Sequence, residues 1–178
     1  IDRDAEQNFG GLAMKSLGGM TLVDTPVQRL NGIHDSAEIA LRDWLSCARF
    51  AEHDQWPRKW AELYVNRSVD DIYNWLRPRG IRFFPIPHWV ERGESGDGNS
   101  LPRYHIIWGT GQHLVRTLIA ELESHPNSRN ITYLFDHKVE SIIMTNQKVT
   151  GLKGCIEPTG ELFEIGAPIV LIASGGIN

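Results

Sequence analysis

The stretch Ile169-Val170-Leu171-Ile172-Ala173-Ser174-Gly175-Gly176 decides the fold class of this chain. Its unbroken apolar run from Ile169 to Ala173 predicts a strand that is buried on both faces, as in the centre of a parallel sheet. The Ala-Ser-Gly-Gly sequence that follows lacks bulky side chains, so a turn there can approach a large ligand closely. Parallel sheets bind cofactors at the carboxyl ends of their strands. The stretch therefore predicts an α/β fold with a cofactor site at this turn.

The opposite end, Ile1-Asp2-Arg3-Asp4, is typical of the last residue of a strand followed by acids. In dinucleotide-binding folds an acidic residue at the end of the second strand binds the ribose hydroxyls. Asp2 is the first candidate for this role and Asp4 the second, while a solvated surface acid is the alternative. Both ends of the chain fall inside apparent structural units, so we expect a fragment of a larger protein.

Composition excludes several classes of protein. The chain has 178 residues, of which 41% are hydrophobic, and this is enough for one domain with a core. Its net charge of −4 gives no basic surface for nucleic acid or anionic membranes. No apolar run reaches the roughly 20 residues of a membrane-spanning helix. Cys47 and Cys155 form no metal-binding pair, and although a disulfide stays open, two thiols in a reducing, cytoplasmic location are favoured.

Hydrophobic periodicity predicts three helical regions and a run of strands. The first helix follows a Ser36 N-cap, the second region runs from Pro57 to a stop at Pro78 and Gly80, and the third spans 112–123. Five of the six tryptophans fall between 44 and 89, which we interpret as the core of a helical layer rather than an aromatic binding surface. The predicted strands are 81–86, 131–135, 139–144, 149–156 and 162–165, the last three forming an antiparallel meander that leads into the terminal strand.

Two glycine pairs follow the acids, Gly10-Gly11 and Gly18-Gly19. Paired glycines permit positive φ and lack the Cβ atoms that would keep backbone N–H groups from a phosphate or a ring. We therefore expect the segment from Gly10 to Met20 to approach a cofactor.

In combination these motifs resemble the flavoprotein subunit family of fumarate reductase and succinate dehydrogenase, in its branch related to ketosteroid dehydrogenases. The matching residues are the acid and glycine pairs within 2–20, Gly98-Asn99-Ser100-Leu101-Pro102-Arg103-Tyr104-His105, Gly109-Thr110-Gly111, the meander and the terminal Ala-Ser-Gly-Gly. The resemblance implies one partial FAD-binding domain over 1–178, of the glutathione-reductase-like Rossmann type with a meander and a helical, Trp-rich insertion. Its expected segments are a glycine-rich cofactor segment (1–30), the insertion (31–100), and the helix, meander and terminal parallel strand (101–178).

The resemblance also implies a cofactor site that is made mostly by the main chain. Its expected FAD-binding residues are Asp2, Gly10, Gly11, Leu12, Ala13, Ser16, Gly18, Gly19, Met20, Val139, Ala173, Ser174 and Gly175. The family's GxGxxG, catalytic arginine and substrate-binding histidines are absent from this sequence. We therefore assign no catalytic residue, and we expect the chain alone to be inactive and to hold FAD weakly or not at all.

Arg103 and His105 flank Tyr104, and in an extended segment both would point to one face. They are candidates for the flavin or substrate side of the site, and hydrogen bonding to neighbouring loops is the alternative. The histidine spacing favours no metal site. The sequence thus predicts part of an FAD-dependent oxidoreductase that transfers hydride between FAD and a C–C bond of a small organic substrate. Alternatives are a binding or structural module that has lost its cofactor, and a nicotinamide-only dehydrogenase. Unpaired sheet edges could also drive self-association.

Overall fold

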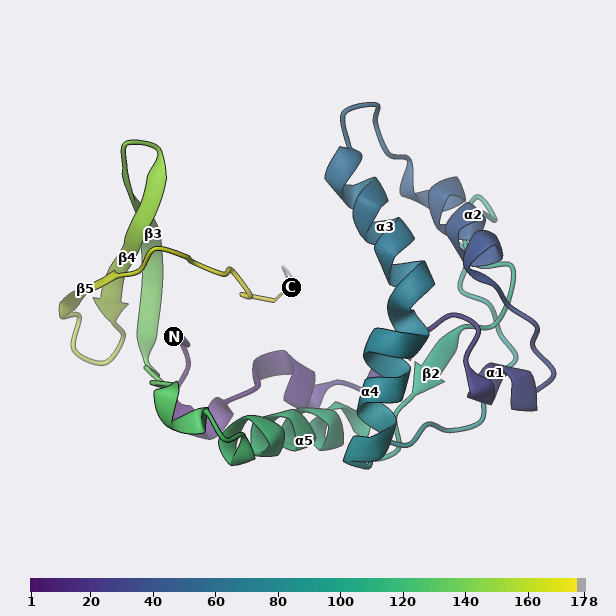
Figure 1. Cartoon of the computed structure of the whole chain (residues 1–178), viewed down its shortest axis with the longest axis horizontal. Coiled ribbons are helices and arrows are strands. Elements are labelled where there is room, and N and C mark those ends of the chain that lie inside the picture. The colour runs from purple at the N-terminus through teal and green to yellow at the C-terminus, as the bar shows by residue number, and fades with distance from the viewer. Residues whose placement is uncertain (176–178) are drawn as a thin grey trace. The chain divides into compact units, whose positions relative to one another are not determined.

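The computed structural model describes residues 1–175 and forms two compact units (Figure 1). Unit 1 contains Ile1–Gly11 and the chain from His125 onward, and unit 2 is Leu12–Ser124. The two glycine pairs therefore lie in different units. These boundaries do not coincide with the expected segments 1–30, 31–100 and 101–178, and the single domain over 1–178 stays a prediction.

Unit 2 is mainly helical, and its three predicted helical regions are confirmed. The Ser36 hydroxyl accepts a hydrogen bond from the N–H of Ile39, which caps the first long helix as expected. The second region ends at Gly80, which has φ 84°. The helical elements are α1 (Pro26–Leu30), α2 (Ala37–Ala48), α3 (Gln55–Arg67), the π-helix η3 (Ser68–Tyr73), α4 (Asn74–Leu76), the 3₁₀ helices η2 (Gly11–Lys15, which begins in unit 1) and η4 (Arg77–Arg79), and α5 (Thr110–Ser124).

The tryptophans are not core residues, contrary to expectation. All six are between 38% and 70% exposed. The core between α2 and α3 is instead built from small side chains, with Ala40 and Val65 packed against Val23. Such short side chains leave too little room between the elements for an indole ring, so the tryptophans lie outside this core.

A two-stranded antiparallel sheet joins the start of unit 2 to a segment near its end. In it β1 (Gly19–Thr21) pairs with β2 (Tyr104–Ile106), with Met20 opposite His105. The strand expected over 81–86 is reduced to one bridge between Phe83 and Ile107. A second core of Leu76, Ile81 and Ile107 lies beside this bridge, with Met20 packed against it.

Unit 1 contains the meander, which is confirmed. Strands β3 (His137–Thr145), β4 (Lys148–Ile156) and β5 (Leu162–Gly166) pair antiparallel in the order β3-β4-β5. Asn146 and Gln147 both have positive φ, as in a tight hairpin turn that matches the strand twist. Unit 1 also has two short 3₁₀ helices, η1 (Glu6–Asn8) and η5 (Ser128–Asn130).

The terminal parallel strand is not formed in the described structure, so this part of the expectation is wrong. Residues 168–175 form no regular element, and Leu171 is 89% exposed. An apolar strand of this kind needs pairing partners and cover on both faces, and residues 1–175 supply neither. Residues 131–135 form no strand either, although their end makes main-chain hydrogen bonds with residues 1–4. Gly176 lies outside the described residues.

Candidate cofactor site

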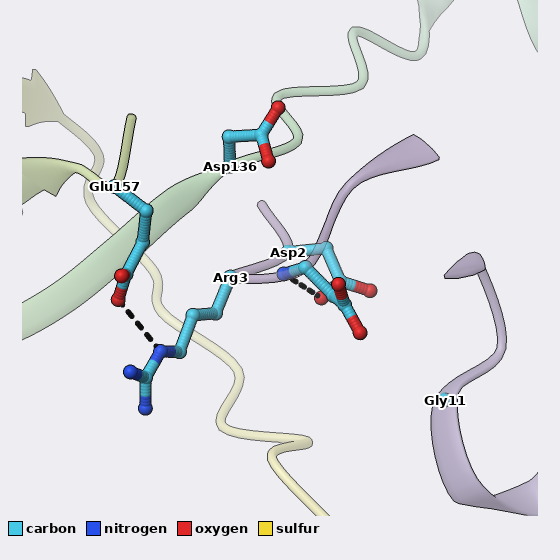
Figure 2. A pocket seen from close by; sticks show the side chains of 6 residues that line it. Asp2, Arg3, Gly11, Asp136 and Glu157 are labelled. Carbon is cyan, nitrogen blue, oxygen red and sulfur yellow. Dashed lines mark hydrogen bonds and ion pairs between the residues drawn. The ribbon is translucent and has the colours of Figure 1, made fainter. Parts of the chain in front are cut away.

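One hollow on unit 1 brings Asp2 and Gly11 together (Figure 2). It has a volume of about 490 Å³ and is open to solvent. The residues that line it are Asp2, Arg3, Asp4, Gly11, Asp136 and Glu157. Two residues that the sequence places at the cofactor, separated along the chain by the η1 helix, thus share one surface.

Main-chain hydrogen bonds fix the acidic end of the chain at this hollow. The N–H of Asp2 donates to the carbonyl of Leu134 at 2.8 Å, and the N–H of His137 donates to the carbonyl of Asp2 at 2.9 Å. The N–H of Asp136 donates to the carbonyl of Asp4 at 3.0 Å. Asp136 has φ 59°, a left-handed conformation that is uncommon for a residue with a side chain and needs support from its surroundings. The backbone of Asp2 is therefore held at both its N–H and its carbonyl by the neighbouring segment 134–137.

The lining of the hollow is acidic. It contains the carboxylates of Asp2, Asp4, Asp136 and Glu157 and a single cation, Arg3. The Nε of Arg3 donates to Oε1 of Glu157 at 2.7 Å, and Figure 2 shows the guanidinium turned toward Glu157 and away from the Asp2 carboxylate. The Oδ1 of Asp2 accepts a hydrogen bond from the N–H of Asp4 at 3.0 Å. Among residues 1–175, no group of three or more His, Cys, Asp or Glu side chains could hold a metal ion.

Gly11 at the hollow and Gly175 at the end of the described residues both combine positive φ with open space beside the α-carbon. Gly11 has φ 53°, and an added Cβ would meet no atom within 4 Å. Gly10 also has positive φ, at 102°.

Val139, another expected cofactor residue, lies on β3 in the same unit, is 42% exposed, and precedes a shift in the β3–β4 register. Gly175 combines φ 79° with open space, as an approaching ligand requires.

The second glycine pair, Gly18-Gly19, is packed against other parts of the chain instead of facing open space. An added Cβ on Gly18 would collide with the N of Gly111 and lie 2.6 Å from the carbonyl carbon of Thr110. An added Cβ on Gly19 would collide with the ring of Tyr104. Backbone atoms of the protein therefore leave no room for a side chain at position 18, whereas at position 19 the Tyr104 ring would have to move, and the expected cofactor contact of both glycines stays a prediction. This close packing sets the backbone from Ala13 to Gly18 against the start of α5.

Hydrogen bonds also hold the segment 12–18 of unit 2 against the start of α5. The N–H of Gly111 donates to the carbonyl of Ser16 at 3.0 Å, and the Ser16 hydroxyl donates to the carbonyl of Ala13 at 2.8 Å. Leu12 and Leu17 stay exposed on this segment, at 63% and 57%. The segment is therefore fixed by its main chain and presents apolar side chains outward.

Arg103 and His105 point to one face as expected, and that face is buried. Arg103 is 1% exposed, and its guanidinium donates to both carboxylate oxygens of Asp35 at 2.7 and 2.8 Å. It also donates to Asp43 at 2.7 Å and to the side chain of Asn99 at 2.9 Å. This geometry favours hydrogen bonding to neighbouring segments over a position at the flavin.

Ionisation of this network follows from its burial and its pairing. Burial lowers the pKa of Arg103, but hydrogen bonds and charge from Asp35 and Asp43 outweigh it, so the net pKa is raised. Burial raises the pKa of Asp43, but hydrogen bonds from Ser100 and Arg103 outweigh it, so the net pKa is lowered. The network is thus a set of buried charges held ionised by their partners.

His105 is fully buried, and its two hydrogen bonds are those of a neutral imidazole. Its Nδ1 lies 2.7 Å from the carbonyl of Arg103, which can only accept, so Nδ1 carries the proton. Its Nε2 accepts from the Thr25 hydroxyl at 2.7 Å. Burial lowers the pKa of His105, and the Arg103 carbonyl and the charge of Asp35 oppose this only in part.

Sequence reasoning missed the partners in both places. No local pattern links Asp35 or Asp43 to Arg103, and only the fold sets them beside it, 68 and 60 positions away. Asp136 and Glu157 at the hollow carry no motif. One local signal was available at Asp136, which stands directly before β3. Asp is among the residues that tolerate positive φ, and Asp136 has such a conformation in the structure.

Asp2 and Gly11 fit the adenosine end of FAD. A carboxylate suits ribose hydroxyls, and an open, left-handed glycine beside it lets a ligand approach the backbone. Asp2 and Gly11 supply both at one hollow. Within the part of the chain that the structure describes, no helix is long and apolar enough to cross a membrane.

Comparisons with known proteins show the family to which the chain belongs. A model of the FAD binding domain family matches residues 4–178. A KsdD-like steroid dehydrogenase of Mycobacterium tuberculosis is 41% identical over 195 residues, covering 100% of this chain and 34% of that protein. The KsdD-like steroid dehydrogenase of Mycolicibacterium smegmatis is 39% identical over 195 residues, covering 100% of this chain and 35% of that protein. The chain spans about a third of the length of these relatives.

Two further matches are more distant. The NADH:fumarate oxidoreductase of Klebsiella pneumoniae is 28% identical over 170 residues, covering 96% of this chain and 17% of that protein. The apo form of the Mycobacterium smegmatis Sdh1 complex has the same fold over 98% of this chain and 29% of that chain, with a TM-score of 0.69 at 21% identity. The family match, the relatives and the fold agree, and the chain therefore belongs to the FAD binding domain family, whose cofactor is FAD.

Proposed function

We propose that this chain supplies the adenosine end of the FAD site in an FAD-dependent dehydrogenase that acts on a steroid or a similar small molecule. The observation that carries the proposal is the meeting of Asp2 and Gly11 at one hollow within a chain of the FAD binding domain family. The 41% identity to a KsdD-like steroid dehydrogenase supports the substrate class.

The roles of the residues follow from their geometry. Asp2 would accept hydrogen bonds from the ribose, and its main-chain bonds to Leu134 and His137 fix its position. Gly11 and Gly175 would admit the cofactor because their α-carbons face open space. The segment 12–20, held by α5, would present its backbone to the rest of the cofactor. FAD itself, when bound, supplies the hydride-accepting chemistry.

The purified full-length protein should carry oxidised flavin, visible in its absorbance spectrum. Gly11→Val should lose flavin, since a branched side chain at a left-handed position would fill the open space and strain the backbone. Gly32→Val is the matched control, because Gly32 also has positive φ (74°) and open space but lies in unit 2 and does not line the hollow. Equal flavin content in both variants would contradict the proposed site.

Substrate class is tested by flavin bleaching without oxygen. A ketosteroid with a saturated C–C bond beside its carbonyl should reduce the bound flavin. Reoxidation of reduced flavin by fumarate, without reduction by the steroid, would instead favour the activity named for the Klebsiella relative. A spectrum without flavin after added FAD would favour a module that has lost its cofactor. The cytoplasmic location expected from the two cysteines stays a prediction.

A further inference from the structure

The hollow on unit 1 is lined by an acid and an arginine, residue types that in other proteins select nucleotides with different groups at the ribose 2′ position. In dinucleotide-binding folds, a carboxylate at the end of the second strand binds a free ribose 2′-hydroxyl, whereas a nearby arginine accommodates a 2′-phosphate. Here Asp2 and Arg3 are neighbours in sequence, and both line the hollow. The sequence alone therefore does not decide between a free hydroxyl and a phosphate.

The structure shows where the positive charge of Arg3 is directed. Its Nε donates to Glu157 at 2.7 Å, and the guanidinium points away from the Asp2 carboxylate (Figure 2). Glu157 is itself placed by its main chain, because its N–H donates to the carbonyl of Asp136 at 2.8 Å. The ion pair thus ties the start of the chain to the end of β4, on the rim of the hollow.

We propose that Glu157 is a specificity-determining residue of the cofactor site. It holds and neutralises Arg3, so that the site takes an adenosine nucleotide with a free 2′-hydroxyl and disfavours one with a 2′-phosphate. The inference rests on the proposed function, which makes this hollow the adenosine end of the FAD site.

Charge supports the proposal independently of the ion-pair geometry. The hollow has four carboxylates against one arginine, and a phosphate monoester carries about −1.5 to −2 charge at neutral pH. Replacing Glu157 by Gln removes one negative charge and frees Arg3, whose planar guanidinium suits a phosphate. The side chains of Arg3 and Glu157 are 70% and 37% exposed, so solvent screens the pair and the effect should be modest.

The test uses the full-length protein freed of FAD. FAD rebinding is followed by flavin fluorescence, with 5′-AMP or adenosine 2′,5′-bisphosphate as competitors, which differ only in the 2′-phosphate. In Glu157→Gln at low ionic strength, the bisphosphate should gain about five-fold relative to 5′-AMP. Arg3→Gln added to Glu157→Gln should remove most of this gain, and so should high salt. Glu161→Gln, which removes the same charge from the same β4–β5 turn at a residue that does not line the hollow, should leave the ratio near that of the unchanged protein.

Three results would overturn the proposal in distinguishable ways. An unchanged ratio in Glu157→Gln, with 5′-AMP still competing, would refute the role of Glu157 alone. An equal gain in Glu161→Gln would show that net charge, not the release of Arg3, sets the preference. Failure of 5′-AMP to compete with FAD in the unchanged protein would refute the proposed site itself.

Discussion

Replacing Arg103 by Met should cause the largest loss of stability of any single change in the buried network. Arg103 is 1% exposed, and its partners Asp35 and Asp43 have side chains that are 0% and 7% exposed. Met fills a similar volume but carries no charge, so both carboxylates would stay buried without a cation. We therefore expect the free energy of unfolding to fall for an electrostatic reason rather than because a cavity forms.

The magnitude follows from the number of bonds lost and their burial. Breaking a buried ion pair by removing one partner costs about 3–5 kcal/mol. Arg103 donates four hydrogen bonds to Asp35, Asp43 and Asn99, which places the loss near the upper part of that range, about 4 kcal/mol. Arg103→Lys keeps the charge but loses the paired contact to Asp35, and about 2 kcal/mol is expected.

The loss should also depend on pH. In the unchanged protein the pKa of Asp43 is lowered, so its stabilising contribution is present above the unfolded pKa of about 3.9 and is lost as the pH falls through the folded pKa. Without Arg103 the opposing effect of burial weighs more, and the pKa of Asp43 rises. The difference between Arg103→Met and the unchanged protein should therefore be larger at pH 7 than at pH 5.

Urea unfolding followed by tryptophan fluorescence measures these differences, since all six tryptophans lie in unit 2. Arg29→Met is the matched control, because Arg29 also pairs twice with one carboxylate, Asp24, but the two side chains are 59% and 36% exposed. We expect the control to lose little stability, because solvent screens this exposed pair. A loss below 1 kcal/mol in Arg103→Met, or one equal to that of the control, would refute the buried network.

Three further changes test other parts of the structure. Burial lowers the pKa of His105, so its neutral form contributes stability above the unfolded pKa of about 6.5, and this stability is lost as the pH falls. In urea unfolding, the free energy of unfolding of His105→Gln should therefore decline less from pH 7.5 to 5.5 than that of the unchanged protein. An equal decline in the two proteins would contradict this. Gly18→Ala should cost about 3 kcal/mol in the same assay, since its Cβ would meet the backbone of Gly111, against about 1 kcal/mol for Gly80→Ala, which has φ 84° but open space; equal losses would contradict the close packing. The 178-residue chain should self-associate in sedimentation velocity through its exposed apolar run, and Leu171→Lys should reduce this; a monomer at all concentrations would contradict it.

The helices and the meander could be predicted from sequence because their signals are local. Ser36 caps α2 through a bond to a residue three positions on, and β3, β4 and β5 alternate and turn within a short span. The terminal strand failed because its signal is not local. An apolar run such as Ile169 to Ala173 becomes a strand only where other strands pair with it, and residues 1–175 provide none.

The candidate site was predicted in the same uneven way. Asp2 and Gly11 could be named as candidates because acids at strand ends and paired glycines have a physical meaning at short range; the structure places both at one hollow, and their contact with the cofactor stays a prediction. Gly18 was predicted to contact the cofactor, and the structure shows that the direction of its missing Cβ is filled by the backbone of Thr110 and Gly111, which the sequence did not reveal. Glycine indicates close approach but not what approaches. The carboxylate partners of Arg103 and Arg3 lie 60 or more positions away along the chain, so only the fold could reveal them.

FAD affinity of an Asp2 variant tests the central claim most directly. In the full-length apoprotein, calorimetric titration should give stoichiometric FAD binding, and Asp2→Ala should weaken it by about 10- to 100-fold, the equivalent of losing hydrogen bonds of 1.5–3 kcal/mol to a charged group. Glu161→Gln, which also removes one carboxylate from unit 1, should bind FAD as the unchanged protein does. Unchanged FAD affinity in Asp2→Ala, with the fold intact, would contradict the assignment of this hollow to the cofactor.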